Sequence, residues 1–164
     1  GQILRKKAMV NLMKNRHIRT DFKVVTRGYI NQKNAGKKLH NRYKFVENIF
    51  NNDYNICVRG AGNYSYRFYE TISTGRIPLF INTDCVLPLD FDIDWKKYCV
   101  WVEETDIKKI DQILLDFHND LSNDDFEELQ VNIRKLWEER LGPKAFYGNI
   151  EQHLDRVVID NAII

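Results

Sequence analysis

The chain of 164 residues lacks several features that would place it in a specialised class of proteins. Its three cysteines, Cys57, Cys85 and Cys99, form no C-x-x-C pair and no Cys/His cluster, which argues against a disulfide scaffold and a zinc site. No secretory signal is visible, and no apolar run reaches the about 18 residues that a membrane-spanning helix needs, although a precursor could carry either. We therefore expect reduced cysteines packed in the core of a globular domain.

The chain also has little net charge, because its 25 basic and 23 acidic residues nearly cancel to +2. A nucleic-acid-binding domain normally carries a clear excess of basic residues, so we expect no nucleic-acid partner. Basic residues near the start of the chain are interpreted as the solvated face of a helix rather than as a membrane or nucleic-acid contact. These residues are Arg5, Lys6, Lys7, Lys14, Arg16 and Arg19.

Helix-period and strand-period patterns alternate along the chain, which predicts an α/β fold with a Rossmann-like parallel sheet flanked by helices. Strands are expected over residues 22–26, 54–58, 77–81 and 98–102. Helices are expected over residues 2–15 and 35–51, from the turn after residue 58 to about residue 75, twice between residues 105 and 142, and over residues 145–158. The length favours a single domain, residues 1–164, in which residues 105–164 are C-terminal helices.

Apolar spacing also predicts which helix faces are buried. The second helix carries a stripe of Leu39, Tyr43, Val46 and Phe50, and we expect this stripe to face the core. The first helix has Leu4, Ala8 and Leu12 on one face. The residues expected to cap later helices are Thr105 or Asp106, and then Ser122.

The stretch from Arg59 to Glu70 is the most informative in the chain, because a glycine-containing turn joins a buried strand to a helix there. Such a turn can present N–H groups and a helix N-terminus to an anion. It is neither a P-loop, which needs lysine before serine or threonine, nor a G-x-G-x-x-G fingerprint, whose third glycine position holds Tyr66 or Arg67. The arginines and the carboxylate suit a nucleotide sugar; an ordinary loop with solvated arginines is the alternative.

The same stretch, together with three later motifs, resembles the exostosin-like glycosyltransferases. The motifs are an arginine-glycine turn, S-x-R-x-x-E, G-x-I-P, a leucine-proline pair and I-D-W, and their order and spacing match the C-terminal half of that family. They lie in Asp53–Glu70, Gly75–Pro78, Val86–Pro88 and Ile93–Trp95. The resemblance extends from about Thr20 to Asp116.

The resemblance implies a role for each residue of the turn in binding the sugar donor. Arg59 and Arg67 would contact the donor diphosphate. Ser65 and the N–H groups around it would bind phosphate oxygens at the helix N-terminus, and Glu70 would accept hydrogen bonds from the ribose hydroxyls. The donor-binding residues implied in this way are Arg59, Gly60, Gly62, Asn63, Ser65, Tyr66, Arg67 and Glu70.

The resemblance also implies the wider architecture and chemistry. Such enzymes have two facing Rossmann-type domains of the GT-B type, with the donor held mainly by the C-terminal one and the glycan acceptor by the N-terminal one. They are inverting, use a general base, and need neither a cofactor nor a metal. The chain opens on a helix without a preceding strand, so we expect a donor-binding fragment of a longer protein, without an assignable catalytic base and without transferase activity of its own.

Two alternatives to this interpretation stay open. Asp90, Asp92 and Asp94 form overlapping D-x-D pairs, which in a different glycosyltransferase fold hold a magnesium or manganese ion, although a solvated loop is the simpler interpretation here. The second alternative is a stand-alone, non-catalytic nucleotide-binding module. A flavodoxin-like regulatory domain would need an acidic cluster at the strand ends, and we see none.

Other single residues carry weaker signals. Each of the four histidines is isolated and is assigned to a helix surface. Trp95 borders the expected pocket and could stack on a base or sugar. Asn63-Tyr64-Ser65 is an N-glycosylation sequon inside the expected donor loop, where a glycan would obstruct binding. This favours a cytoplasmic, bacterial-type location, with the Golgi lumen as the alternative.

Overall fold

A parallel sheet of three strands forms the centre of the computed structural model, which describes residues 1–24 and 34–151. The strands lie in the order β1-β2-β3, with Tyr54 paired to Ile77 and Leu79 paired to Val100. Their bounds are Tyr54–Cys57 for β1, Ile77–Asn82 for β2 and Val100–Glu103 for β3. The predicted α/β fold with a parallel sheet is therefore confirmed, and the two-domain GT-B arrangement stays a prediction.

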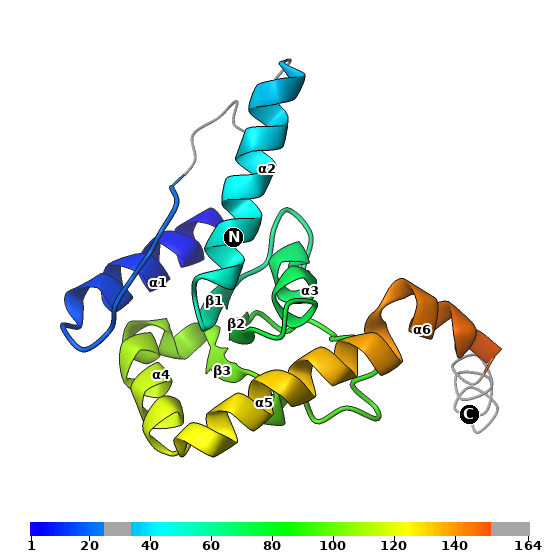
Figure 1. Cartoon of the computed structure of the whole chain (residues 1–164). Coiled ribbons are helices and arrows are strands. Elements are labelled where there is room, and N and C mark those ends of the chain that lie inside the picture. Colours follow the sequence, from blue (N-terminus) through cyan, green and yellow to red (C-terminus); the bar gives the residue numbers. More distant parts are fainter. Residues whose placement is uncertain (25–33, 152–164) are drawn as a thin grey trace.

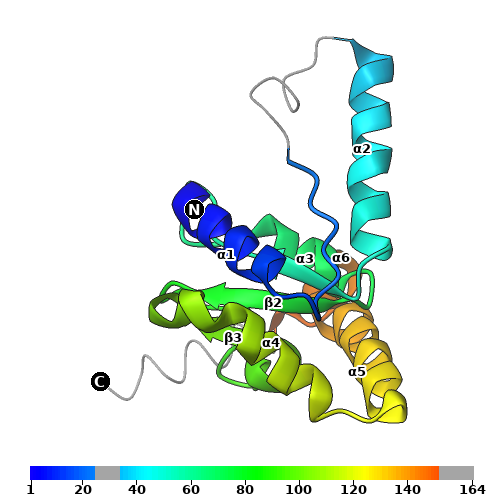
Figure 2. The ribbon, with the colours of Figure 1, turned by 90° about the vertical axis from the view of Figure 1, so that its left-hand side faces the viewer.

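Helices cover both faces of this sheet. Figures 1 and 2 show α1 and α4 on one face and α3 on the other, with α2 rising away from the body of the molecule. The helices are α1 (Gln2–Lys14), α2 (Ala35–Phe50), α3 (Tyr66–Ile72), α4 (Ile110–Asn119), α5 (Asn123–Leu136) and α6 (Pro143–Gly148). Shorter helical segments of other types are Trp95–Lys97, Glu104–Lys109 and Trp137–Leu141.

The core lies between the sheet and the helices on its two faces. All positions of β2 from Ile77 to Ile81 are buried, as expected for a central strand with helices on both sides. Phe68 of α3 packs edge-on against Phe80 of β2 at a centroid distance of 5.4 Å and against Trp95 at 5.0 Å. The predicted apolar face of α1, which consists of Leu4, Ala8 and Leu12, is buried.

A glycine in the left-handed region lies between the end of α3 and the start of β2. Gly75 has φ +67°, a conformation that residues with a Cβ rarely adopt. Its N–H donates to the carbonyl of Ile72 at 3.1 Å, and the N–H of Arg76 donates to the carbonyl of Thr71 at 3.1 Å. These two bonds satisfy the last carbonyls of α3 and direct Ile77 into the sheet.

The apolar stripe predicted for α2 faces solvent instead of the core, so this prediction is wrong. Leu39, Tyr43 and Phe50 are 56%, 66% and 48% exposed, and Val46 is half-buried. The side of α2 that faces the body carries Asn48 and Ile49, both of which are buried. Periodicity located the stripe correctly on the helix, but it cannot say which side of a helix meets the rest of the protein.

Several predicted boundaries also differ. The predicted cap at Thr105 or Asp106 is wrong, because a 3-10 segment, Glu104–Lys109, precedes α4, and α4 has no side-chain cap. Ser122 caps α5 as predicted, in a capping box with Asp125. Residues 22–24 are not in a strand, and residues 25 and 26 of that predicted strand lie outside the described residues. The predicted C-terminal helix exists as α6, and its residues 152–158 lie outside the described part of the chain.

Candidate functional site

The parallel sheet brings the segments after all three strands to one edge, because parallel strands end on the same side. Arg59 follows β1, Thr83 follows β2 and Glu104 follows β3. Asn82 at the end of β2 donates a hydrogen bond to Glu103 at the end of β3, over 2.8 Å. The carboxyl edge of the sheet is therefore a connected surface, and it is where ligands of such sheets bind.

Asn63 fastens the loop after β1 to the loop after β2. Its side-chain amide donates to the carbonyls of Thr83 at 3.0 Å and of Asp84 at 2.9 Å, and its Oδ1 accepts from the Thr83 hydroxyl at 2.6 Å. Both N–H donors of the side-chain amide, and one acceptor site on its oxygen, are therefore used within the protein. Asn63 therefore holds the two loops together at the edge, and the nitrogen that would carry a glycan is the atom that donates to Thr83 and Asp84.

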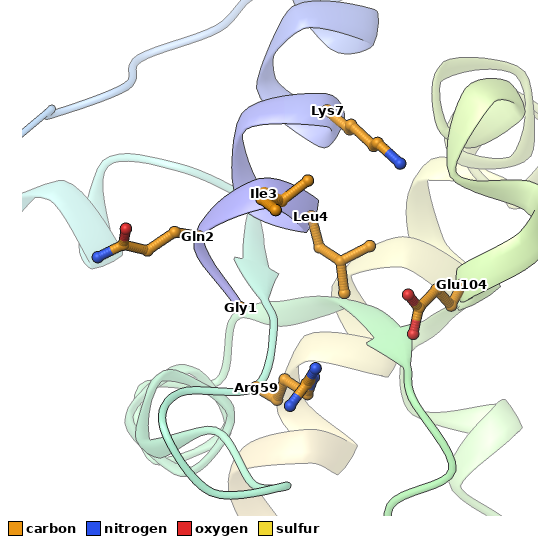
Figure 3. Close-up of a pocket in the computed structure, with 7 residues that line it drawn as sticks. All are labelled: Gly1, Gln2, Ile3, Leu4, Lys7, Arg59 and Glu104. Carbon is orange, nitrogen blue, oxygen red and sulfur yellow. The ribbon is translucent and has the colours of Figure 1, made fainter.

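A pocket of about 380 Å³ lies at this edge, between the start of α1 and the loops after β1 and β3. Figure 3 shows Arg59 and Glu104 reaching towards the space below Leu4, whereas Gln2 points away from it. Neither Arg59 nor Glu104 forms an ion pair or a side-chain hydrogen bond with another described residue. The remaining lining residues are Gly1, Ile3 and Lys7.

The glycines keep the turn after Arg59 narrow. The N–H of Gly60 donates to the carbonyl of Tyr64 at 3.0 Å and closes the loop. A Cβ on Gly62 would lie 2.6 Å from Cε1 of Tyr64, so the absence of a side chain lets that ring fold back over the loop. Tyr64 packs edge-on against Tyr66 at 5.2 Å, and Tyr66 remains 72% exposed.

Ser65 precedes α3 but does not cap it through its side chain. The residue is only 8% exposed, and its hydroxyl makes no hydrogen bond with another described residue. A buried hydroxyl without a partner is unusual, since burial of a polar group costs about 1–3 kcal/mol when it makes no hydrogen bond. Ser65 therefore keeps a free donor and acceptor next to the turn.

Arg67 extends from α3 towards Asn48 of α2 and Asn55 of β1. Its Nη2 donates to Oδ1 of Asn48 at 2.8 Å and to Oδ1 of Asn55 at 3.4 Å. The guanidinium also stacks on the ring of Phe45 at 4.6 Å. Partial burial lowers the pKa of Arg67, while the nearby Cys57 acts in the opposite direction. In this structure Arg67 ties α3, α2 and β1 together.

Glu70 lies one turn further along α3 and also faces α2. Its Oε1 is 3.4 Å from Nη1 of Arg42, and both side chains are partly exposed. An ion pair of this length and exposure contributes little, typically about 0–1 kcal/mol. Glu70 is therefore held loosely and could exchange Arg42 for another hydrogen-bonding partner.

The structure thus divides the predicted donor-binding residues into two groups. Arg59, the two glycines, Asn63, Ser65 and Tyr66 lie in or beside the turn at the carboxyl edge, whereas Arg67 and Glu70 face α2. The sequence reasoning missed Lys7 and Glu104, which line the pocket. Two features of the sequence could have indicated these residues. Lys7 lies one helical turn after buried Leu4, and Glu104 directly follows a strand, at the edge where ligands bind.

The aspartates of the D-x-D run point to other partners. Asp92 accepts a hydrogen bond from Arg140 at 2.5 Å, and Asp94 lies 3.6 Å from Lys97. Among residues 1–24 and 34–151, no group of three or more His, Cys, Asp and Glu side chains lies close enough together to hold a metal ion. Asp90 is exposed. The described residues therefore offer the D-x-D alternative no ligand cluster.

Trp95 is a core residue rather than a sugar platform. It is 4% exposed, packs against Phe68 and donates its indole N–H to the carbonyl of Pro88 at 3.0 Å. The cysteines are free thiols as predicted, and Cys57 and Cys99 are buried. His118 is on a helix surface as assigned, where its Nδ1 lies 3.0 Å from the hydroxyl of Tyr54, and His153 lies outside the described residues.

Comparison with known proteins gives the same family as the motifs. The chain is 25% identical over 122 residues to Exostosin-1 of Drosophila melanogaster, which covers 74% of this chain and 15% of that protein. It is 28% identical over 127 residues to the Exostosin-1 homolog of Caenorhabditis elegans, covering 76% of this chain and 31% of the relative. A probable glucuronosyltransferase of Oryza sativa subsp. japonica is 41% identical over 59 residues, which are 36% of this chain and 14% of the relative.

The chain spans less than a third of the length of each of these relatives. They come from an insect, a nematode and a plant, so they give no support to the bacterial-type, cytoplasmic location expected from the sequon. No helix within residues 1–24 and 34–151 is long and apolar enough to span a bilayer.

The resemblance predicted from the motifs is confirmed by the family match. The exostosin GT47 domain family matches residues 6–117, which include most of α1, the turn after β1, all of the sheet and most of α4. The match therefore covers more than half of the chain and every predicted donor-binding residue. This chain belongs to the exostosin GT47 family of glycosyltransferases.

Proposed function

We propose that this chain holds the nucleotide diphosphate of a sugar donor at the carboxyl edge of its sheet, within a glycosyltransferase that transfers the sugar to a glycan or a related acceptor. The observation that carries the proposal is the Arg59 guanidinium, which lines the edge pocket and is unpaired among the described residues. Arginine presents a planar fork of donors that matches phosphate oxygens. A pocket at the carboxyl ends of parallel strands is also where such ligands bind.

Charge in the pocket suits a leaving diphosphate. As the bond from the anomeric carbon to the phosphate oxygen breaks, negative charge grows on the nucleotide, and fixed cations stabilise it. Arg59 and Lys7 supply these cations in the proposal, and Ser65 supplies a hydroxyl beside the turn. Glu104, on the other side of the pocket, accepts hydrogen bonds from hydroxyls of the ligand and keeps the phosphates on the Arg59 side.

Arg67 and Glu70 have different parts in this proposal. The hydrogen bonds of Arg67 to Asn48 and Asn55 favour a positioning role, in which Arg67 holds α3 and the turn in place. Glu70 binds the ribose hydroxyls by giving up its loose contact with Arg42. Asn63 positions the loops at the edge, and Gly60 and Gly62 leave room for the turn.

The transfer itself is proposed to be inverting and independent of a metal. The acceptor hydroxyl attacks the anomeric carbon from the face opposite the nucleotide, and a general base takes its proton. The arginine and lysine side chains would take the place of a metal ion in balancing the diphosphate. We assign no base within the described residues, and the acceptor is proposed to bind to a facing domain.

Ligand binding tests the proposal directly. Thermal unfolding of the purified chain would be measured with UDP, GDP, dTDP and CMP, and with the matching nucleosides. We expect one nucleotide with a phosphate chain to raise the melting temperature in the way that mass action predicts, and its nucleoside to do so much less. Arg59→Gln should remove most of the shift. Arg19→Gln, which removes the same charge from an exposed position, should retain it.

Two results would overturn the proposal. One is equal stabilisation by nucleoside and nucleotide for every base, because phosphate recognition would then be absent. The other is an unchanged shift in Arg59→Gln, because the pocket would then not be the phosphate site. Phosphate binding without any sugar transfer, in the chain and in the longer protein that contains it, would favour a non-catalytic binding module.

A further inference from the structure

Tyr64 and Tyr66 form an exposed aromatic pair at the turn that carries Arg59. Their rings pack edge-on, with a centroid distance of 5.2 Å and an interplanar angle of 88°. In an edge-on pair at least one ring keeps both of its faces clear of the other ring. Tyr66 is 72% exposed and Tyr64 is 50% exposed, so Tyr66 is the more open of the two. The pair therefore offers a flat aromatic surface at the carboxyl edge of the sheet.

Local contacts hold these rings in place although both are exposed. The N–H of Gly60 donates to the carbonyl of Tyr64 at 3.0 Å and closes the turn. The ring of Tyr64 lies over Gly62, where a Cβ would come within 2.6 Å of it. Asn63 fastens the same turn to the loop after β2. Side chains on a turn that is held in this way lose less conformational freedom when a ligand binds.

The closed turn carries a cation at one end and the aromatic pair at the other. Arg59 directly precedes Gly60, and its side chain lines the edge pocket (Figure 3). Because Gly60 bonds to Tyr64, the backbone at the aromatic end of the turn returns to the Arg59 end. A ligand that binds both needs a negative group and a flat ring in one molecule. A nucleotide has this combination, with phosphates at one end and a base at the other.

The position of Tyr66 on α3 favours the base over the transferred sugar as the group that it contacts. Tyr66 is the first residue of α3 and Glu70 follows four residues later, so the two side chains lie on the same side of the helix. The proposed function places the ribose at Glu70. The base is joined to the ribose, whereas the transferred sugar lies beyond the phosphates. A ring on the same side of α3 as Glu70 therefore suits the base.

The structure also removes the aromatic platform that the sequence suggested. Trp95 is 4% exposed and belongs to the core, so its ring faces are not available to a ligand. The exposed tyrosines Tyr43 and Tyr147 lie on α2 and α6. The tyrosines at the turn that carries Arg59 are Tyr64 and Tyr66.

We propose that Tyr66, supported edge-on by Tyr64, stacks on the base of the nucleotide. This inference rests on the proposed nucleotide site and adds a base-binding subsite to it. Every base has a π-face, so an aromatic side chain stacks on all of them, and loss of such a contact commonly lowers affinity by about fivefold to 140-fold. Tyr66 therefore adds affinity for each nucleotide without selecting one base.

Calorimetry with inorganic pyrophosphate and with UDP, GDP and dTDP separates the base from the phosphates. We expect Tyr66→Ala to weaken the binding of the tightest of these nucleotides by about tenfold or more. Its affinity for pyrophosphate, which has no base, should change by less than about twofold. Tyr66→Phe keeps the ring and should bind both ligands like the unaltered chain.

Two further variants serve as controls. Tyr147→Ala removes a tyrosine that is 68% exposed on α6, and it should leave the affinities for nucleotide and pyrophosphate unchanged. Tyr64→Ala should weaken nucleotide binding less than Tyr66→Ala, because Tyr64 only supports the stacking ring. Because the rings are exposed, circular dichroism should show every variant folded.

Three results would overturn the base subsite and leave the phosphate site in place. One is an unchanged nucleotide affinity in Tyr66→Ala, because the ring would then not touch the base. Another is an equal loss for pyrophosphate, because Tyr66 would then act by shaping the turn. The third is a loss confined to nucleotide sugars, because the ring would then contact the transferred sugar. Failure of pyrophosphate and of every nucleotide to bind the unaltered chain would overturn the proposed nucleotide site and this inference together.

Discussion

The Arg67 guanidinium donates a hydrogen bond to the side-chain oxygen of Asn48 at 2.8 Å, and this contact joins α3 to α2. Asn48 is buried and Arg67 is half-buried. The same guanidinium also donates to the side-chain oxygen of Asn55 in β1, at 3.4 Å. The arginine of the S-x-R-x-x-E motif is therefore part of the framework that supports the candidate site.

Replacing Arg67 should reduce the stability of the fold. Arg67→Ala leaves the side-chain oxygens of Asn48 and Asn55 without this donor and removes the stacking on Phe45. We expect the free energy of unfolding in urea to fall by about 2–4 kcal/mol. A variant that keeps its stability but loses nucleotide binding would instead assign Arg67 to direct contact with the ligand.

Replacing Glu70 should affect ligand binding more than folding. Glu70→Gln removes a carboxylate whose ion pair with Arg42 is long and partly exposed. The free energy of unfolding should therefore change by less than about 1 kcal/mol. Nucleotide affinity should fall by about 1–3 kcal/mol, measured by calorimetry, because a hydrogen bond to a charged group is lost. The loss should shrink for a ligand without 2′- and 3′-hydroxyls.

A control variant and one contrary result complete the test of Glu70. Arg42→Gln removes the partner of Glu70 and should leave nucleotide affinity unchanged or slightly improved, since the carboxylate is then free. Unfolding of Glu70→Gln would make Glu70 a structural residue and would end its proposed role at the ribose.

Nucleotide binding should not require a divalent cation. Affinity measured with and without EDTA is expected to agree within about twofold, because Arg59 and Lys7 supply the compensating charge in the proposal. The Asp90, Asp92 and Asp94 run is the reason for the measurement. A large loss with EDTA that manganese restores would revive the D-x-D alternative.

Alkaline pH should destabilise the fold through its buried thiols. Burial raises the pKa of Cys57 from its ordinary value of 9.0 to about 12, although Thr71 acts in the opposite direction. Below pH 9 the thiol is protonated in both the folded and the unfolded chain, so its contribution to the free energy of unfolding is fully present. Above pH 9 it ionises only when the chain unfolds, so the free energy of unfolding should fall as pH rises towards 12.

Urea unfolding between about pH 8 and pH 11 checks this dependence. Cys57→Ala should weaken the slope without removing it, because burial also raises the pKa values of Cys99 and Tyr54. A slope that is identical in Cys57→Ala would show that this thiol is not the group responsible.

The sequence by itself determined the order and type of most elements. The short apolar runs at β1, β2 and β3, the serine cap of α5 and the glycine after α3 are local signals, because hydrogen bonding and steric limits act within a few residues. The linked motifs likewise predicted the family, since they depend on residue type and spacing alone.

Tertiary structure decided how those elements face one another. Helical periodicity gave the stripe of Leu39, Tyr43 and Phe50 but not its outward orientation, which follows from the hydrogen bonds of Asn48 on the other side of α2. The division between Arg59 at the pocket and Arg67 at α2 also depends on contacts between residues far apart in the chain. Such contacts depend on which surfaces pack together, and the spacing of residues along one helix or turn carries no information about its partner.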